Sequence, residues 1–106
     1  MTEFIQVTTA ISSKEGAQKI AQILVEQRLA ACVHVVGPIT STYWWQGKIE
    51  IEEEWTCAAK TQKELYRAVE KAIREAHPYD EPEIVALPIV HGSQSYLDWI
   101  VVETTQ

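Results

Sequence analysis

The strongest constraint in this sequence is a pattern that occurs twice, in which a β-rich segment leads into a helix-starting motif and an amphipathic helix. Residues 12–15 (Ser-Ser-Lys-Glu) and 61–64 (Thr-Gln-Lys-Glu) both match the capping box, in which a Ser or Thr accepts from a helix amide while a Glu three residues later reaches back. We therefore predict that Ser12 caps the first helix and Thr61 the second. The apolar positions that follow recur at helical spacing: Ala17, Ile20, Ala21, Leu24 and Val25, then Leu65, Val69, Ala72, Ile73 and Ala76.

Segments of β character flank both predicted helices, since alternation and short apolar runs between turn signals are typical of strands. After the last of them, we predict that Ser95 caps a short C-terminal helix running to Trp99, followed by an extended piece over residues 100–104. The strands are predicted over residues 4–8, 29–36, 39–45, 48–60 and 83–90.

Glycine and proline set several of these boundaries. Residues 37–38 (Gly-Pro) separate the second predicted strand from the third, and residues 46–47 (Gln-Gly) predict a hairpin turn. Residues 77–78 (His-Pro) end the second helix, because the position before a proline disfavours helical backbone. Pro88 restricts the last strand to a sheet edge or a bulge.

The order strand-helix-strand, strand-helix-strand predicts an α+β fold, the ferredoxin-like βαββαβ sandwich with an antiparallel sheet. Right-handed crossovers place both helices on one face of that sheet. With 106 residues, the chain forms one domain over residues 1–106.

The second face of the predicted sheet has no element of this chain left to cover it, which predicts an oligomer. Trp44 and Trp45 are adjacent on one predicted strand, so their side chains point to opposite faces. One of them faces away from the helices, and a tryptophan in that position is a common anchor of a subunit interface.

Composition excludes several partners. Lys and Arg number 9 and Asp and Glu 15, which gives a formal net charge of −6, and an acidic surface repels nucleic acid and anionic membranes. Two cysteines are too few for a disulfide framework. The first residues carry no long apolar stretch, so we expect a cytoplasmic protein without a membrane span.

Several short motifs, in order along nearly the whole chain, resemble the CutA family, the divalent-cation tolerance proteins. They include Leu-Ala-Ala-Cys-Val at 29–33, Tyr-Trp-Trp-Gln-Gly-Lys at 43–48, His-Pro-Tyr at 77–79 and Leu-Pro-Ile at 87–89. The resemblance implies a homotrimer whose long strands pair between neighbours, and a likeness to PII signalling proteins, whose ligands lie between subunits. It also implies a link to copper tolerance and, in animal members, to the anchoring of a secreted esterase. We assign Tyr43, Trp44, Trp45 and Trp55 to the trimer interface.

Cys32 and His34 are the first candidates for metal ligands. They are two residues apart on a predicted strand and therefore share a face. A thiolate and an imidazole suit Cu(I), Cu(II) or Zn(II). The alternative is a buried cysteine beside a histidine that binds a backbone carbonyl. His34 stands where the family usually has Asn, so a metal ligand is gained here.

Three glutamates, Glu50, Glu52 and Glu54, alternate along one predicted strand. Carboxylates in a row are ligands for hard divalent cations, and the alternative is a solvated strand face that discourages edge pairing. The family pattern carries an acid at Glu54, which makes Glu54 the preferred metal ligand of the three.

Lys60, His77 and Tyr79 are candidates for a cleft that binds a small anion. Lys60 precedes a predicted helix start, where free amides favour an anion. His77 and Tyr79 follow a helix end, and the alternative role for them is a helix stop with a packed aromatic ring. The PII likeness places such a cleft between subunits.

The sequence therefore predicts a trimeric, non-enzymatic protein that binds copper or another divalent cation. No catalytic triad, Gly-rich phosphate loop or acid–base pair is evident. Two alternatives remain, a PII-like sensor of a small anion and a structural trimer without a specific ligand. A trimer with buried tryptophans is expected to be thermostable and to melt in a concentration-dependent way.

Overall fold

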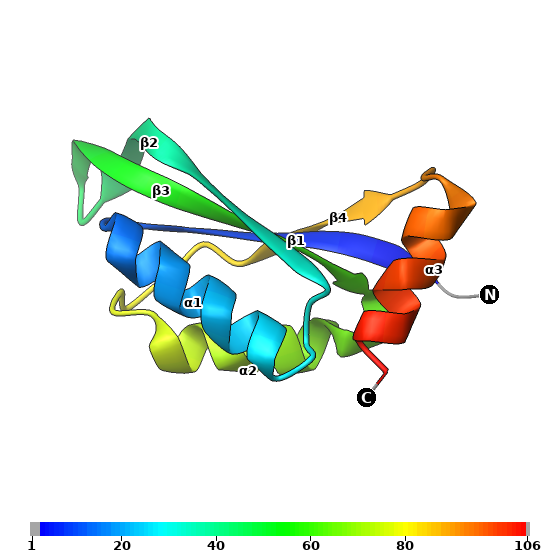
Figure 1. The fold of residues 1–106 in the computed structure, drawn as a ribbon. Helices are drawn as coiled ribbons and strands as arrows, with labels where there is room; N and C mark the ends of the chain where they lie inside the picture. Colours follow the sequence, from blue (N-terminus) through cyan, green and yellow to red (C-terminus); the bar gives the residue numbers. More distant parts are fainter. Residues whose placement is uncertain (1–2, 106) are drawn as a thin grey trace.

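Four strands form one antiparallel sheet with the spatial order β2-β3-β1-β4 in the structure, a computed structural model that describes residues 3–105. Helices α1 and α2 lie side by side against one face, and α3 lies at the end of the molecule where β4 leaves the sheet (Figure 1). This confirms the α+β, ferredoxin-like class. The elements are β1 (Phe4–Ile11), α1 (Lys14–Glu26), β2 (Cys32–Trp45), β3 (Lys48–Gln62), a 3-10 turn (Lys63–Leu65), α2 (Tyr66–Ala76), β4 (Val85–Ile89) and α3 (Gln94–Glu103).

Strand β1 is interior to the sheet. It pairs with β3 from Phe4 opposite Gln62 to Ile11 opposite Trp55, and with β4 on its other side. Strand β4 is the edge of the sheet, so Pro88 removes no hydrogen bond from an interior ladder. The edge position predicted for Pro88 is confirmed.

Strands β2 and β3 form a long hairpin that extends beyond the rest of the sheet. Because β1 ends opposite Trp55, residues 48–54 of β3 pair only with β2. We call residues 39–54 the hairpin arm. The molecule measures 44 × 25 × 22 Å, and its radius of gyration of 14.3 Å exceeds the roughly 13 Å expected for a compact chain of this length.

The prediction that residues 37–38 separate two strands was wrong. Strand β2 is continuous, and its register shifts between Val36 and Ile39 so that two residues lie opposite Trp55. Such a bulge absorbs a proline without ending the strand. The turn predicted at residues 46–47 is confirmed, and both of its residues have positive φ.

The first helix begins one residue later than predicted. Ser13, not Ser12, is the cap: its backbone is extended and its hydroxyl accepts from the amide of Gly16 at 2.9 Å. Strand β1 continues to Ile11, so the chain needs one more extended residue before it can turn into the helix. Ala17, Ile20 and Leu24 are buried on α1 as predicted, whereas Val25, predicted on the same face, is 43% exposed.

The second capping box does not form. Thr61 belongs to β3, lies opposite Ile5 of β1 and is fully buried. The helix follows a 3-10 turn that has no side-chain cap. Pairing with β1 therefore prevails over the local helix signal. His77 ends α2 as predicted.

The C-terminal segment from Gln94 to Glu103 is one helix. Ser93 rather than Ser95 caps α3, and residues 100–103 are helical instead of extended. Ile100 is completely buried, and Arg28 binds Glu103 at 2.7 Å, which holds the helix end against the turn after α1. No helix within residues 3–105 has the length and apolar character that crossing a membrane requires.

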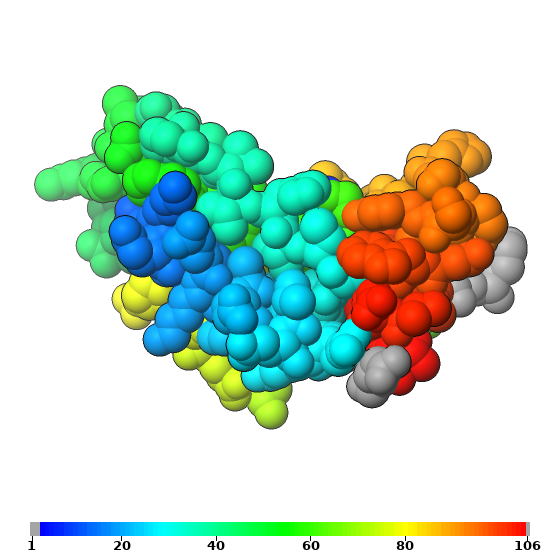
Figure 2. Space-filling view, viewed as in Figure 1, coloured from blue at the N-terminus to red at the C-terminus, as the bar shows by residue number. Residues whose placement is uncertain are grey.

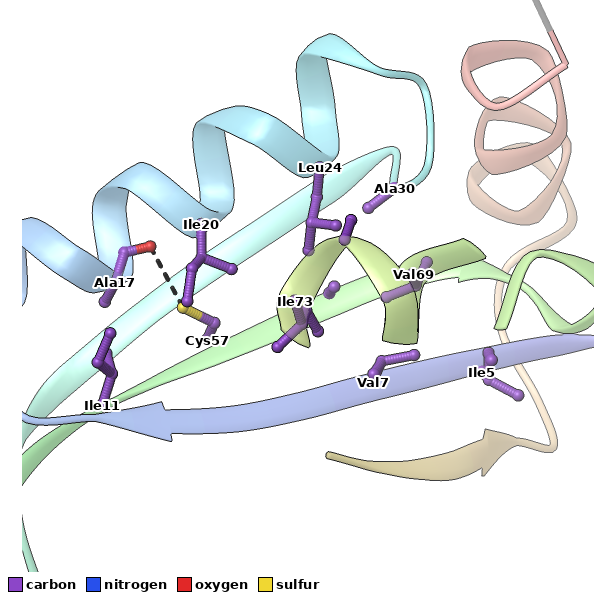
Figure 3. Packing of buried hydrophobic residues seen from close by; sticks show 12 residues of the cluster. Ile5, Val7, Ile11, Ala17, Ile20, Leu24, Ala30, Cys57, Val69 and Ile73 are labelled. Atoms are coloured by element: carbon purple, nitrogen blue, oxygen red, sulfur yellow. Dashed lines mark hydrogen bonds between the residues drawn. The ribbon is translucent and has the colours of Figure 1, made fainter. Parts of the chain in front are cut away.

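The hydrophobic core lies between the sheet and the two helices α1 and α2 (Figure 3). Ile20 and Leu24 of α1 and Ile73 of α2 point onto the sheet. Cys57 of β3 is only 1% exposed, and its thiol donates to the carbonyl of Ala17 at 3.3 Å. Burial raises the pKa of Cys57 to about 11. Cys57 is therefore a packing residue of the core.

Candidate functional site

Three polar side chains form a row at the start of β2. Pairing with β3 places Cys32 opposite Lys60, and His34 lies two residues further along the strand. The Cys32 Sγ is 3.6 Å from His34 Nε2, and the Lys60 Nζ is 3.4 Å from His34 Nδ1. The alternation of side chains along β2 therefore brings Cys32 and His34 together as predicted. We call Cys32, His34 and Lys60 the thiol–imidazole row.

Hydrogen-bond chemistry fixes the arrangement of this row. A lysine ammonium can only donate, so Nδ1 of His34 accepts and the ring proton lies on Nε2. That proton points to the sulfur of Cys32, which accepts it. His34 is exposed and Cys32 is half-buried, so a metal ion from outside can reach both residues, and it binds Nε2 by displacing the proton that Nε2 shares with the sulfur.

Helix α3 borders the thiol–imidazole row. Burial raises the pKa of Tyr96, and Cys32 adds to the shift by its charge and as a hydrogen-bond partner. Figure 2 shows that the start of β2, in cyan, meets α3, in orange, beside the hollow between α3 and the hairpin arm. The strand segment that carries Cys32 and His34 therefore borders this hollow.

Glu54 is not part of this row. It lies six residues along β3 from Lys60, which corresponds to about 20 Å of extended strand. Within the part of the chain that the structure describes, no three His, Cys, Asp or Glu side chains are grouped closely enough to hold a metal ion. Cys32 and His34 thus offer one sulfur and one nitrogen, and a full coordination shell needs further donors.

A second feature is a cavity of about 870 Å³ between the hairpin arm and the loop that follows α2. Its walls are residues 41–45 of β2, Glu54 of β3, Ala10 of β1 and residues 78–83. The loop, in yellow, lies at the same end of the molecule as the hairpin arm (Figure 1). We call this space the arm cavity.

Hydrogen bonds hold the loop of the arm cavity in place. His77 is buried, and its Nε2 donates to the carbonyl of Ala10 at 2.8 Å. Its Nδ1 accepts from the amide of Tyr79 at 3.2 Å. Because Nδ1 accepts, the ring carries its proton on Nε2. Both ring nitrogens are occupied and the residue is buried, so His77 positions the loop and is closed to a ligand from outside.

Tyr79 joins the loop to β3. Its hydroxyl donates to Oε2 of Glu54 at 2.8 Å, and Glu54 is only 6% exposed. Burial, together with the hydrogen bond to Glu54, raises the pKa of Tyr79 to about 12. The phenol therefore stays protonated and keeps donating at neutral pH.

The three residues predicted for an anion cleft are separated in the structure. Tyr79 lines the arm cavity and His77 lies beneath its loop, whereas Lys60 contacts His34 in the thiol–imidazole row. Sequence reasoning missed the contribution of Asp80, Glu81 and Glu83 to the cavity. The acidic run directly after His-Pro-Tyr was the available signal.

The aromatic residues predicted for an interface lie mostly on the hairpin arm. Trp44 is 71% exposed, and Tyr43 and Trp45 are also exposed. Trp55 is half-buried and packs against Gly37. Ile49 and Ile51 are exposed on the same arm, so the arm carries an uncovered apolar surface.

The comparisons with known proteins agree with this fold. The CutA1 divalent ion tolerance protein family model matches residues 5–103. The divalent-cation tolerance protein CutA of Thermus thermophilus is 43% identical over 100 residues, which cover 94% of this chain and 95% of that protein. A chloroplastic CutA 1 protein of Oryza sativa is 38% identical over 96 residues, which cover 91% of this chain but only 54% of that protein.

Solved structures give the same result. The structure of the periplasmic divalent cation tolerance protein CutA from Archaeoglobus fulgidus superposes with a TM-score of 0.89 and 40% identity, covering 98% of this chain and 99% of that chain. Sequence and structure thus agree over nearly the whole length of the domain. The chain belongs to the CutA1 divalent ion tolerance protein family.

Proposed function

We propose that this protein is a non-enzymatic homotrimer that binds copper or another divalent cation at Cys32 and His34 and so contributes to cation tolerance. The observation that carries the proposal is the 3.6 Å contact between Cys32 Sγ and His34 Nε2 at an accessible position. Thiolate and imidazole are the ligand types that copper and zinc prefer. The family description, ion tolerance rather than a reaction, supports a binding role.

The exposed apolar surface supports self-association. Trp44, Ile49 and Ile51 of the hairpin arm and Leu87 of β4 are exposed, and a large uncovered apolar surface marks an interaction site. Strand β2 is also an edge of the sheet, so its outer backbone groups are free to pair with another chain. A second copy is then the source of the donors that Cys32 and His34 lack.

The metal site is tested by titrating the reduced, metal-free protein with Cu(I) against a competing chelator. We expect a dissociation constant of about 1 nM or below and a fixed ratio of metal to chain. Cys32→Ser and His34→Asn should each weaken binding, whereas His91→Asn, at an exposed position outside the row, should not. Micromolar binding with drifting stoichiometry, or full affinity in Cys32→Ser, would overturn the site.

The oligomeric state is tested by sedimentation velocity. We expect one species of three chains, and dissociation in the variant Ile51→Glu, which places a charge on the exposed apolar face of the hairpin arm. A monomer at all concentrations would contradict the trimer, and the metal site would then need all its donors from one chain.

The second candidate function is a sensor of a small anion. The ammonium of Lys60 beside His34 favours an anion at the thiol–imidazole row, and loss of anion binding in Lys60→Ala would support this candidate. If neither a metal nor an anion binds, a structural trimer without a ligand is the remaining function. The cytoplasmic location stays a prediction, since relatives are described as chloroplastic and periplasmic.

A further inference from the structure

The arm cavity combines carboxylates with aromatic walls. Four acidic residues line it, namely Glu54, Asp80, Glu81 and Glu83, and none of its lining residues among those the structure describes is Lys, Arg or His. The potential inside is therefore negative. The pKa of Tyr43 is raised first by burial and then by the charges of Glu52, Glu54 and Glu50, of which Glu54 lines the cavity.

Glu54 gives this cavity a specific anchor. Glu54 is only 6% exposed as a residue and still lines the cavity. Oε2 accepts from the Tyr79 hydroxyl, while the structure shows no hydrogen bond to Oε1 within residues 3–105. A buried carboxylate normally has a positively charged partner. A cation bound in the arm cavity supplies the partner that the chain itself does not provide.

The aromatic walls decide which kind of cation fits. Tyr43, Trp44, Trp45 and Tyr79 line the same space, and aromatic faces attract organic ammonium groups through cation–π interactions. A hard metal ion such as Mg²⁺ or Ca²⁺ instead needs several oxygen ligands at one point. Among the residues that the structure describes, the carboxylates are not grouped closely enough to ligate such a metal ion. An organic cation with apolar substituents is larger, so it can contact carboxylates and aromatic rings that lie apart.

We propose that the arm cavity binds an organic ammonium ion, with Glu54 as the main anionic contact and the rings of Tyr43, Trp45 and Tyr79 as its walls. Strand alternation gives Trp44 to the other face of β2, the face of the self-association surface. This site is separate from the thiol–imidazole row and does not depend on metal binding there. Tyr79 has a positioning role, because its hydrogen bond holds one oxygen of Glu54 and leaves the other for the ligand.

Three ligands of similar shape but different charge test the proposal by isothermal titration calorimetry at neutral pH. Benzylammonium, benzyl alcohol and benzoate share one ring and differ in charge. We expect benzylammonium to bind at least about tenfold more tightly than benzyl alcohol, and benzoate not to bind. Equal affinities, or a preference for benzoate, would overturn the proposal and leave an apolar groove.

Variants locate the site. Glu54→Gln keeps an acceptor for Tyr79 but removes the charge, and should weaken benzylammonium binding about tenfold. Glu81 is exposed on the loop, so Glu81→Gln does not put folding at risk, and it should weaken benzylammonium binding to a smaller extent. Glu75→Gln, on the exposed face of α2, is the matched control and should bind like the parent. Unchanged affinity in both cavity variants would overturn the site.

Competition separates an organic cation from a metal ion. Mn²⁺ at millimolar concentration should not displace benzylammonium beyond the effect of the same ionic strength of NaCl. Displacement at micromolar Mn²⁺ would identify a metal site and overturn the proposal. Cys32→Ser, which disables the proposed copper site, should leave benzylammonium affinity unchanged. The proposal for the arm cavity can therefore be contradicted without affecting the proposal for the copper site, and the reverse.

Discussion

Gly37 lies directly against the indole of Trp55, so that a Cβ atom at position 37 would stand 2.4 Å from Trp55 Cδ1 and 2.7 Å from Cγ. The register shift of β2 produces this approach, because two residues of β2 lie opposite Trp55. The hairpin arm begins at this point. The packing of one glycine on one indole therefore helps to set the direction in which the arm leaves the sheet.

We expect Gly37→Ala to displace the Trp55 ring and to lower the free energy of unfolding by about 1–3 kcal/mol, as overpacking does elsewhere. Urea denaturation measures the loss, and near-UV circular dichroism reports the ring. Gly47→Ala is the control, since no atom lies within 4 Å of a Cβ there and only its positive φ opposes alanine. A smaller loss in Gly37→Ala than in Gly47→Ala would contradict this account.

Replacing Tyr79 should change the response of stability to alkali. The pKa of Tyr79 rises from 10.0 to about 12 on folding, so between these values the unfolded chain binds fewer protons than the native one. The resulting stabilisation is present below pH 10 and is lost as pH rises through 12. Tyr79→Phe should show a shallower loss of stability over that range in chemical denaturation.

Burial raises the pKa of Cys57 as well, so Cys57 also contributes to the loss of stability in alkali. The informative quantity is therefore the difference in the free energy of unfolding between the parent protein and Tyr79→Phe at each pH. Tyr66→Phe, at the start of α2 and outside the arm cavity, serves as the matched variant. If both variants flatten the profile equally, Tyr79 is not the group responsible.

The two thiols should react at very different rates. Cys32 is half-buried beside an accessible histidine, whereas Cys57 is 1% exposed and has its pKa raised to about 11. Because the thiolate is the reactive form, we expect a disulfide reagent such as DTNB to modify one thiol per chain rapidly. Cys57→Ala should keep the fast thiol and Cys32→Ser should lose it. Two fast thiols in the parent would contradict the buried position of Cys57.

Removing the cap of α1 should destabilise the protein. Ser13→Ala deletes the acceptor for the Gly16 amide, and loss of such a cap costs about 1 kcal/mol. Ser95→Ala, at an exposed helical position of α3, should have little effect, since alanine favours helix. Thermal unfolding distinguishes the two, and equal stability of both variants would mean that the cap contributes nothing.

The elements of this fold were predictable where a pattern repeats along the chain. Ile20 and Leu24 belong to a helical period that burial in the core enforces. Single local signals were less reliable, because Thr61 has a helix-capping neighbourhood but is held in β3 by its pairing with β1. Residues 100–103 are rich in β-branched side chains and are helical because Ile100 packs into the interior.

The same distinction applies to the sites. Cys32 and His34 are neighbours on one strand, so strand alternation alone predicts their contact. The arm cavity joins β2, β3 and a loop from the second half of the chain. The pairing of Tyr79 with Glu54 depends on how α2 returns the chain to the sheet, which no local pattern of the sequence specifies.

The place of β1 between β3 and β4 also governs when the chain can fold. Its partners begin at residue 55 on one side and end at residue 89 on the other. During synthesis the first strand leaves the ribosome long before either partner exists, and contacts so distant in sequence form slowly. An interrupted chain that ends before β4 leaves one side of its most buried strand unpaired, so a truncated product of this gene would be prone to aggregate and a target for proteolysis.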